Sequence, residues 1–239
     1  MNTNKIKWAP ELSGVQEVSL VGAANLSYWT KQLSQEGLRP LEKDGQAQVL
    51  IIAAGARFLG LRFQEMSICV LASTDEAASS QQEAFLVHAF NSRRFFAFCE
   101  RALFSTPYYY GDVRASPEIP ASIEVADARA VLFRAEMQRR DAGAPQRKPS
   151  RSADDGWEGC VYLPTRQARS DHRRQLFFAR LKGYTKSYTF LQHEDSCLIR
   201  PARKHPALEA LIASQFAPTE WIIRENATHA KSKTYRQPT

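Results

Sequence analysis

Three consecutive tyrosines follow a proline in the segment RALFSTPYYYGDV, residues 101–113. A phenol hydroxyl donates and accepts hydrogen bonds, and a buried one can act as a general acid. Side chains alternate between two sides of an extended chain, so Tyr108 and Tyr110 should share one side and Tyr109 the other. At least one phenol is therefore expected to face the interior. The alternative is a tyrosine that only fills a structural corner.

A carboxylate stands in the apolar segment LRFQEMSICV, residues 61–70. Burying Glu65 without a partner would be costly, so it should either line a cavity or pair with an arginine such as Arg62 or Arg101. In a cavity it would suit a general acid or base with a raised pKa. Arg101 also has two interpretations, because a guanidinium can bind a substrate carboxylate or tie a helix end to a strand.

The remaining candidates are expected to contact a ligand without carrying the chemistry. His88 lies in the apolar run FLVHAF, where a hydrogen-bonded core histidine is the commoner situation and a catalytic one the alternative. We place His88, Arg62, Tyr109 and Tyr110 among the binding residues. The four cysteines form no C-x-x-C pair, so free thiols, no metal site and no cofactor are expected.

The elements that must position these residues are mostly strands. Apolar and β-branched runs separated by short links predict strands that pair in an antiparallel way. Helices are expected where a capping residue precedes apolar residues at helical spacing, and Asn25, Asn91 or Ser92, and Pro206 mark their starts. The expected strands are 15–24, 46–60, 61–74, 84–90, 122–138 and 219–226, with strand-like pieces in 157–165, 175–190 and 196–202, and the helices are 25–37, 91–104 and 206–217.

This pattern predicts an α+β, β-rich fold. We expect one domain over residues 1–239, built as a closed or partly closed antiparallel β-barrel with a central cavity and a few peripheral helices. No apolar run is long enough to span a membrane, and the N-terminal residues lack the apolar core of a signal peptide. A cytoplasmic location without membrane contact is expected, and whether the chain forms a homo-oligomer stays open.

The positive charge is concentrated in residues 134–186, which hold 13 Lys and Arg against 6 Asp and Glu and so account for the whole net charge of +7. Within them, residues 138–156 are rich in Arg, Pro, Ser and Gly, and predict an exposed flexible basic loop. Nucleic-acid binding is not favoured, because the segment carries no known reading motif. A solvated loop or a subunit contact is preferred.

The order of segments and the tyrosine turn together resemble the acetoacetate decarboxylase-like superfamily. The family's turn reads Gly-Arg-Glu-Leu-Trp-Gly-Phe-Pro-Lys-Lys, and residues 100–109 read ERALFSTPYY. Arg101, Leu103 and Pro107 keep the register, while tyrosines replace both lysines. The resemblance is closest to a bacterial branch that carries an Arg before a Pro-Tyr-Tyr turn and has no Schiff-base lysine.

The resemblance implies a pocket without the family's lysine chemistry. In the decarboxylases the first lysine of the turn forms a Schiff base, which a phenol cannot do. Because no lysine lies between Lys43 and Lys148, no close sequence neighbour can substitute, and decarboxylase activity is not expected. Glu65 falls about where the family has a cavity glutamate.

The expected function is binding of a small carboxylate or carbonyl compound in a cavity formed by Glu65, Arg101 and Tyr108. Whether the protein is an enzyme stays open. If it is one, the residues suit lyase-like or isomerase-like acid/base chemistry, such as enolisation or hydration and dehydration. The alternative is a non-catalytic ligand-binding or scaffold protein.

Overall fold

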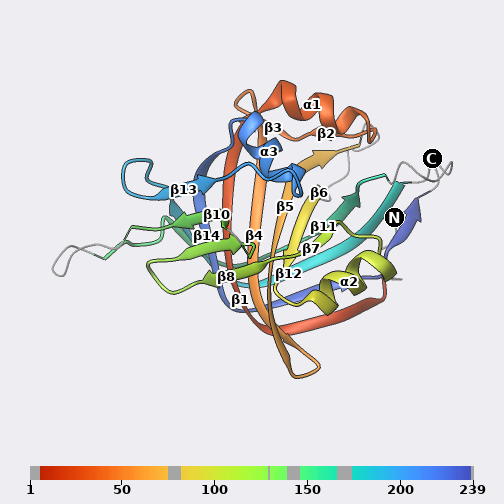
Figure 1. Cartoon of the computed structure of the whole chain (residues 1–239). Coiled ribbons are helices and arrows are strands. Elements are labelled where there is room, and N and C mark those ends of the chain that lie inside the picture. The colour runs from red at the N-terminus through yellow and green to blue at the C-terminus, as the bar shows by residue number, and fades with distance from the viewer. Residues whose placement is uncertain (1–5, 75–81, 129, 139–145, 166–173, 238–239) are drawn as a thin grey trace.

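The fold is taken from a computed structural model that describes residues 6–74, 82–128, 130–138, 146–165 and 174–237. Most of the described residues lie in strands, and three helices, α1, α2 and α3, accompany them (Figure 1). The helices are α1 (Leu26–Ser34), α2 (Arg94–Leu103) and α3 (Pro206–Ala213).

Seven long strands pair in a closed circle. Starting at β1, the pairings run β1–β4, β4–β5, β5–β6, β6–β11, β11–β12, β12–β14 and back to β1. Four short strands extend this sheet at its margins: β2 (Arg39–Pro40), β3 (Glu42–Lys43), β7 (Tyr108–Tyr110) and β15 (Tyr235–Gln237). The ring strands are β1 (Trp8–Asn25), β4 (Gln46–Phe58), β5 (Leu61–Ser73), β6 (Gln82–Asn91), β11 (Arg151–Leu163), β12 (Arg174–Thr189) and β14 (Ala217–Ser232).

The expectation of purely antiparallel pairing is wrong at two places. β6 runs parallel to both β11 and β7. Parallel neighbours need a crossover connection, and here the chain leaves β6 through α2 and most of a second sheet before it returns as β11. Short links between the earlier strands gave no sign of this crossover.

The second sheet packs on the outside of the ring. Its order is β13-β10-β9-β8, with β8 (Asp112–Ser116), β9 (Ser122–Ala126), β10 (Val131–Glu136) and β13 (Ser196–Ile199). Side chains alternate between the two faces of each ring strand. On β4, Val49 and Ile51 face the second sheet, since they belong to the same core cluster as Ile123 and Phe133. The intervening residues of β4 therefore point to the inside of the ring.

The helix signals are partly confirmed. The Asn25 side chain accepts a hydrogen bond of 2.8 Å from the backbone N–H of Tyr28 and caps α1, and Pro206 stands at the first turn of α3. For α2, the N-cap residue is Arg93, whose side chain makes no capping bond. The Asn91 side chain instead accepts from the Arg93 N–H. No helix in the described part of the chain is long and apolar enough to cross a membrane. The cytoplasmic location stays a prediction.

The predicted basic loop is shorter than expected. Residues 139–145 lie outside the described residues, but β11 begins at Arg151 and pairs with β12 along its whole length. Backbone hydrogen bonds to β12 extend the expected strand-like piece to residues 151–156, where the composition predicts none. Arg147 is also not a solvated loop residue, since its guanidinium binds the buried carboxylate of Asp195 at 2.8 Å.

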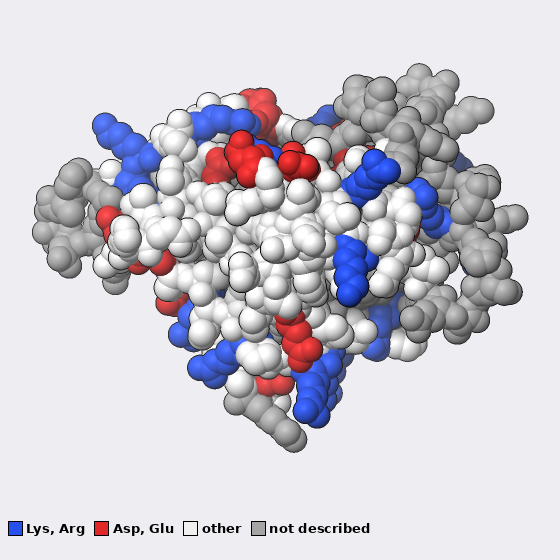
Figure 2. All heavy atoms as spheres, turned by 90° about the horizontal axis from the view of Figure 1, so that it is seen from above, with Lys and Arg blue, Asp and Glu red and all other residues white. Residues whose placement is uncertain are grey.

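Several other basic side chains of residues 134–186 are engaged in ion pairs. Arg180 pairs with Glu11 at 2.7 Å and Lys186 with Glu225 at 3.0 Å. On the face seen in Figure 2, the coloured Lys and Arg side chains lie in separate places with acidic residues among them.

Candidate ligand pocket

A cavity of about 270 Å³ is lined by residues of all seven ring strands, together with α2 and β7. This size lies just below the usual range of roughly 300–1,000 Å³ for ligand sites, so it suits a small compound. Its wall is mostly apolar and includes Leu50, Ile52, Phe63, Leu86, Val161 and Phe177. The ring therefore encloses the pocket, and α2 contributes to its wall.

Polar groups from four different elements reach this apolar wall. Glu65 comes from β5, Glu100 from α2, Tyr108 from β7, and His229 and Lys231 from β14. Glu65 follows the pleat of β5, because Met66 and Ile68 belong to the outer core cluster while Glu65 itself lines the pocket.

Glu65 and Tyr108 lie next to each other. The Tyr108 hydroxyl donates to Glu65 Oε2 over 3.4 Å, and Tyr108 is only 6% exposed. Burial, reinforced by the negative charge of Glu100, raises the pKa of Glu65. Burial and the neighbouring Glu65 raise the pKa of Tyr108 well above its usual value. Glu65 forms no salt bridge among the described residues, and the charges of Lys231 and His229 offset only part of this rise in its pKa.

Lys231 is the pocket residue that the sequence reasoning missed. Its ammonium nitrogen lies 2.5 Å from Glu100 Oε2, which also accepts a 2.8 Å hydrogen bond from the Thr106 hydroxyl. The same nitrogen lies 5.7 Å from the ring centroid of Tyr108. No lysine is near the turn in sequence, as the spacing indicated, but the fold brings Lys231 of β14 beside it.

The error arose from the end of the last strand. The expected strand 219–226 is too short, because β14 continues to Ser232 after an irregularity at Asn226, which has a φ of 57°. His229 and Lys231 are two positions apart on this strand, so both can face the pocket. In the segment THAKS, residues 228–232, the small residue Ala230 separates His229 from Lys231. This alternation was the only sequence signal that the strand continues.

His229 is hydrogen-bonded to a buried charged network on the side of its ring away from Nδ1. Glu17 is fully buried and accepts hydrogen bonds from Arg224 Nη1 at 2.5 Å and from the Ser19 hydroxyl at 2.9 Å. His229 Nε2 lies 2.7 Å from Glu17 Oε2. Burial alone would raise the pKa of Glu17, but the His229 hydrogen bond and the Arg224 charge outweigh it and lower that pKa to about 2.

Tyr109 and His88 lie on the other face of the sheet, so their expected contact with the cavity is not found. Their rings stack with centroids 4.5 Å apart, and His88 Nε2 lies 3.1 Å from His205 Nδ1. The register explains this placement: His88 opposes Ile68, whereas Leu86 opposes Cys69, so an extra residue reverses the alternation in β6. Burial lowers the pKa of His88 to about 3 and keeps it neutral.

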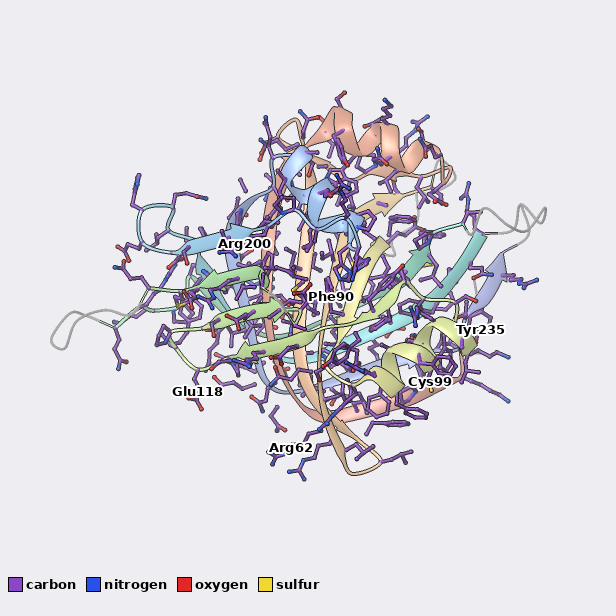
Figure 3. All side chains as sticks on the ribbon, in the orientation of Figure 1. Arg62, Phe90, Cys99, Glu118, Arg200 and Tyr235 are labelled. Carbon is purple, nitrogen blue, oxygen red and sulfur yellow. The ribbon has the colours of Figure 1, made fainter. Side chains whose placement is uncertain are left out.

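Three further candidates also lie outside the pocket lining. Tyr110 is 47% exposed beneath the guanidinium of Arg94, because β7 ends there at the sheet margin. Arg101 is exposed in the last turn of α2, and its guanidinium carbon lies 5.5 Å from the Tyr109 ring centroid. Arg62 lies near the β4–β5 turn, away from the ring interior (Figure 3), and its backbone oxygen accepts from Arg93. Of the expected trio, Glu65 and Tyr108 line the pocket, whereas Arg101 is not among the lining residues.

The described residues contain no cluster of three or more His, Cys, Asp or Glu side chains that could hold a metal ion. Cys69, Cys99, Cys160 and Cys197 are free thiols. Cys69 and Cys99 line the pocket, and burial raises the pKa of Cys69 to about 12, which disfavours a reactive thiolate.

The sequence matches no family model and no curated protein sequence. Solved structures do resemble it. An acetoacetate decarboxylase from Legionella pneumophila superposes with a TM-score of 0.62 at 12% identity, covering 98% of this chain and 90% of that one. An acetoacetate decarboxylase-like enzyme from Sphingomonas wittichii RW1 gives 0.57 at 13% identity, with 95% and 92% covered. The enduracididine biosynthesis enzyme MppR, complexed with pyruvate, gives 0.62 at 10% identity, with 98% and 93% covered. The chain therefore has the acetoacetate decarboxylase fold.

Proposed function

We propose that this acetoacetate decarboxylase-like protein binds a small carbonyl or carboxylic compound with an apolar body and catalyses proton transfer on it. The reaction class is enolisation or hydration and dehydration, without a covalent lysine intermediate. The observation that carries the proposal is the pairing of the half-buried carboxyl group of Glu65 with the buried phenol of Tyr108, 3.4 Å apart at the wall of an apolar pocket.

Each polar group of the pocket has a different role in this proposal, which depends on its protonation state. A protonated Glu65 can give its proton to a carbonyl oxygen, and the Tyr108 hydroxyl can donate a hydrogen bond to the same oxygen as charge develops there. Lys231 adds a positive charge on this side of the pocket. The apolar wall takes the rest of the ligand and excludes water, which strengthens these interactions.

The role of Lys231 is electrostatic in this proposal. Its ammonium nitrogen is ion-paired with Glu100, and an ammonium group is not a nucleophile. The pyruvate bound by MppR is a small oxo acid, and this supports the same ligand class here. Borohydride treatment with α-oxocaproate should leave the protein mass unchanged. A reduced adduct on Lys231 would overturn the non-covalent part of the proposal.

Deuterium exchange tests the chemistry without knowledge of the natural substrate. Benzylacetone, a neutral ketone, and α-oxocaproate, an oxo acid, are incubated with the protein in D₂O, and proton NMR follows loss of the signal from the carbon beside the carbonyl. We expect exchange to be faster than in buffer and to fall by about 100-fold in Glu65→Gln, the usual effect of a general acid. Exposed Glu225→Gln serves as the control, with the wild-type rate.

The non-catalytic alternative rests on the same cavity, because an apolar wall alone can hold a ligand. The two functions separate in this assay. Probe binding seen by titration calorimetry, with exchange no faster than in buffer, would support a ligand-binding protein and overturn the enzyme proposal.

A further inference from the structure

The carboxylate of Glu17 fixes the protonation of the imidazole that reaches the pocket. Glu17 is fully buried, and its ionised form can only accept hydrogen bonds. His229 Nε2 lies 2.7 Å from Glu17 Oε2, so Nε2 must carry the proton in that bond. In the neutral ring the other nitrogen, Nδ1, then bears the lone pair.

Glu17 is itself held in place from two further sides. Arg224 Nη1 donates to Glu17 Oε1, and Arg224 Nε donates over 2.9 Å to the hydroxyl of Thr185 on β12. The Ser19 hydroxyl is a third donor to Glu17. These bonds connect β1, β12 and β14, so the orientation of the imidazole is set by three strands of the ring.

Nδ1 of His229 is the nitrogen left for a ligand. The side chain is 14% exposed and lines the cavity, and Nδ1 has no hydrogen-bond partner among the described residues. A positive charge on His229 lowers the pKa of Glu65, so the two groups are close enough to interact electrostatically. A carboxylate, an imidazole and an unpartnered ring nitrogen at a pocket are the parts of an oriented general base.

We propose that His229 is the general base of this pocket, that it takes a proton from the carbon beside the ligand's carbonyl group, and that Glu17 and Arg224 are its positioning residues. This inference rests on the proposed function and deepens it, since it supplies the partner that the acid Glu65 requires. The ligand class becomes a carbonyl compound that carries at least one hydrogen on the adjacent carbon.

The proton transfers balance between two groups. The C–H bond breaks as Nδ1–H forms, and its electron pair makes the carbon–carbon double bond of the enol. The carbonyl π electrons move to oxygen, which takes the proton of Glu65. The products are an enol, an imidazolium on His229 and a carboxylate on Glu65. In D₂O the reverse step returns a deuteron to the carbon, provided the imidazolium has exchanged with solvent.

The first test needs no ligand. Long-range nitrogen–proton NMR of the wild-type protein should show His229 protonated at Nε2 and not at Nδ1 when the ring is neutral. In Glu17→Gln the amide can donate as well as accept, so the signals should shift toward the other tautomer. A wild-type ring protonated at Nδ1 would overturn the inference.

The second test uses the two probes. In His229→Gln we expect deuterium exchange to fall by about 100-fold while affinity for benzylacetone stays within about tenfold. The matched control is His193→Gln, because His193 is exposed in the turn before β13 and should leave both values unchanged. Exchange at the wild-type rate in His229→Gln would overturn the inference and leave the proposed function standing.

A third measurement keeps the two proposals distinguishable. Diethyl pyrocarbonate acylates accessible imidazoles, and peptide mass spectrometry locates the product. We expect benzylacetone to protect His229 and not His193. Modification of His229 at the same rate with and without bound benzylacetone would overturn its place in the site. Wild-type protein that binds the probe without exchange would overturn the proposed function and, with it, the catalytic step of His229.

Discussion

The ammonium nitrogen of Lys231 lies 2.5 Å from a carboxylate oxygen of Glu100, although 131 positions separate the two residues. Both line the pocket, and Lys231 also lies against the rings of Phe104 and Phe177, with centroids 5.0 and 4.7 Å from its nitrogen. The pocket thus holds a paired cation, whose nitrogen lies 5.7 Å from the ring centroid of Tyr108.

Lys231→Met should weaken binding of the anionic probe more than that of the neutral one. A hydrogen bond to a charged group contributes about 1.5–3 kcal/mol, so α-oxocaproate should lose at least about tenfold in affinity relative to benzylacetone. Titration calorimetry measures both values. Exposed Lys182→Met is the control, and an equal loss for both probes would contradict a charge-specific role.

Tyr108→Phe should slow deuterium exchange by about 100-fold, because it deletes one preorganised donor to the developing oxyanion. Tyr110→Phe is a matched control, since this phenol is exposed under Arg94 and outside the pocket. The prediction fails if both variants exchange at the wild-type rate or lose the rate to the same extent.

Exchange should depend on pH through Glu65. Its pKa is raised by burial and by Glu100, so the acid form extends above the usual range of a glutamate. The rate should fall as pH rises through the folded-state pKa of Glu65, because the acid form of this carboxyl group is lost. The free energy of unfolding should change with pH in the same direction. The folded state binds this proton more tightly than the unfolded state does, and the resulting stabilisation is lost as pH rises through the folded-state pKa. A pH–rate profile of wild type that matches that of Glu65→Gln would contradict this.

Acid should destabilise the protein through Glu17. Its pKa falls from 4.5 to about 2 on folding, so the carboxylate contributes stability above pH 4.5 that is lost as pH falls toward 2. The contribution is on the order of 3 kcal/mol. Urea unfolding between pH 6 and pH 3, followed by fluorescence, should show a steeper loss in wild type than in Glu17→Gln. The half-exposed Glu11→Gln should keep the wild-type slope.

The buried ion pair of Asp195 and Arg147 should be a major stabilising contact. The Asp195 carboxylate is fully buried and also accepts from the indole N–H of Trp221 at 3.0 Å. Asp195→Asn leaves the Arg147 charge without its partner, and the free energy of unfolding should drop by about 3–5 kcal/mol. The exposed pair of Asp112 and Arg114 gives the control, since Asp112→Asn should cost less than about 1 kcal/mol in the same urea titration.

The sequence predicted the features that depend on neighbours along the chain. Alternation in an extended tripeptide required one phenol to face inward, and Tyr108 does. The same pleat placed Glu65 on a face opposite to Met66 and Ile68, away from their core cluster. The caps of α1 and α3 were readable for the same reason, because their signals lie within one helical turn.

The sequence-based predictions were wrong where the side-chain alternation of a strand is interrupted or where strand pairing depends on distant segments. The irregularity between Ile68 and Cys69 in the β5–β6 pairing turns His88 to the outer core, and no residue type in FLVHAF marks it. The parallel pairing of β6 with β11 depends on a crossover that only the assembled sheets define. The extended course of residues 151–156 at the start of β11 rests on backbone bonds to β12, which composition does not encode.

The amino-acid sequence by itself determined a β-rich fold, an inward tyrosine and a glutamate facing away from the outer core. Only the tertiary structure decided which charges share the pocket, because closing the ring brings β14 beside β1 and its Lys231 against Glu100 of α2. Contacts between residues more than 100 positions apart depend on strand order and register, and neither can be read from local spacing. The physical reason is that side-chain direction is a local property, whereas proximity belongs to the whole sheet.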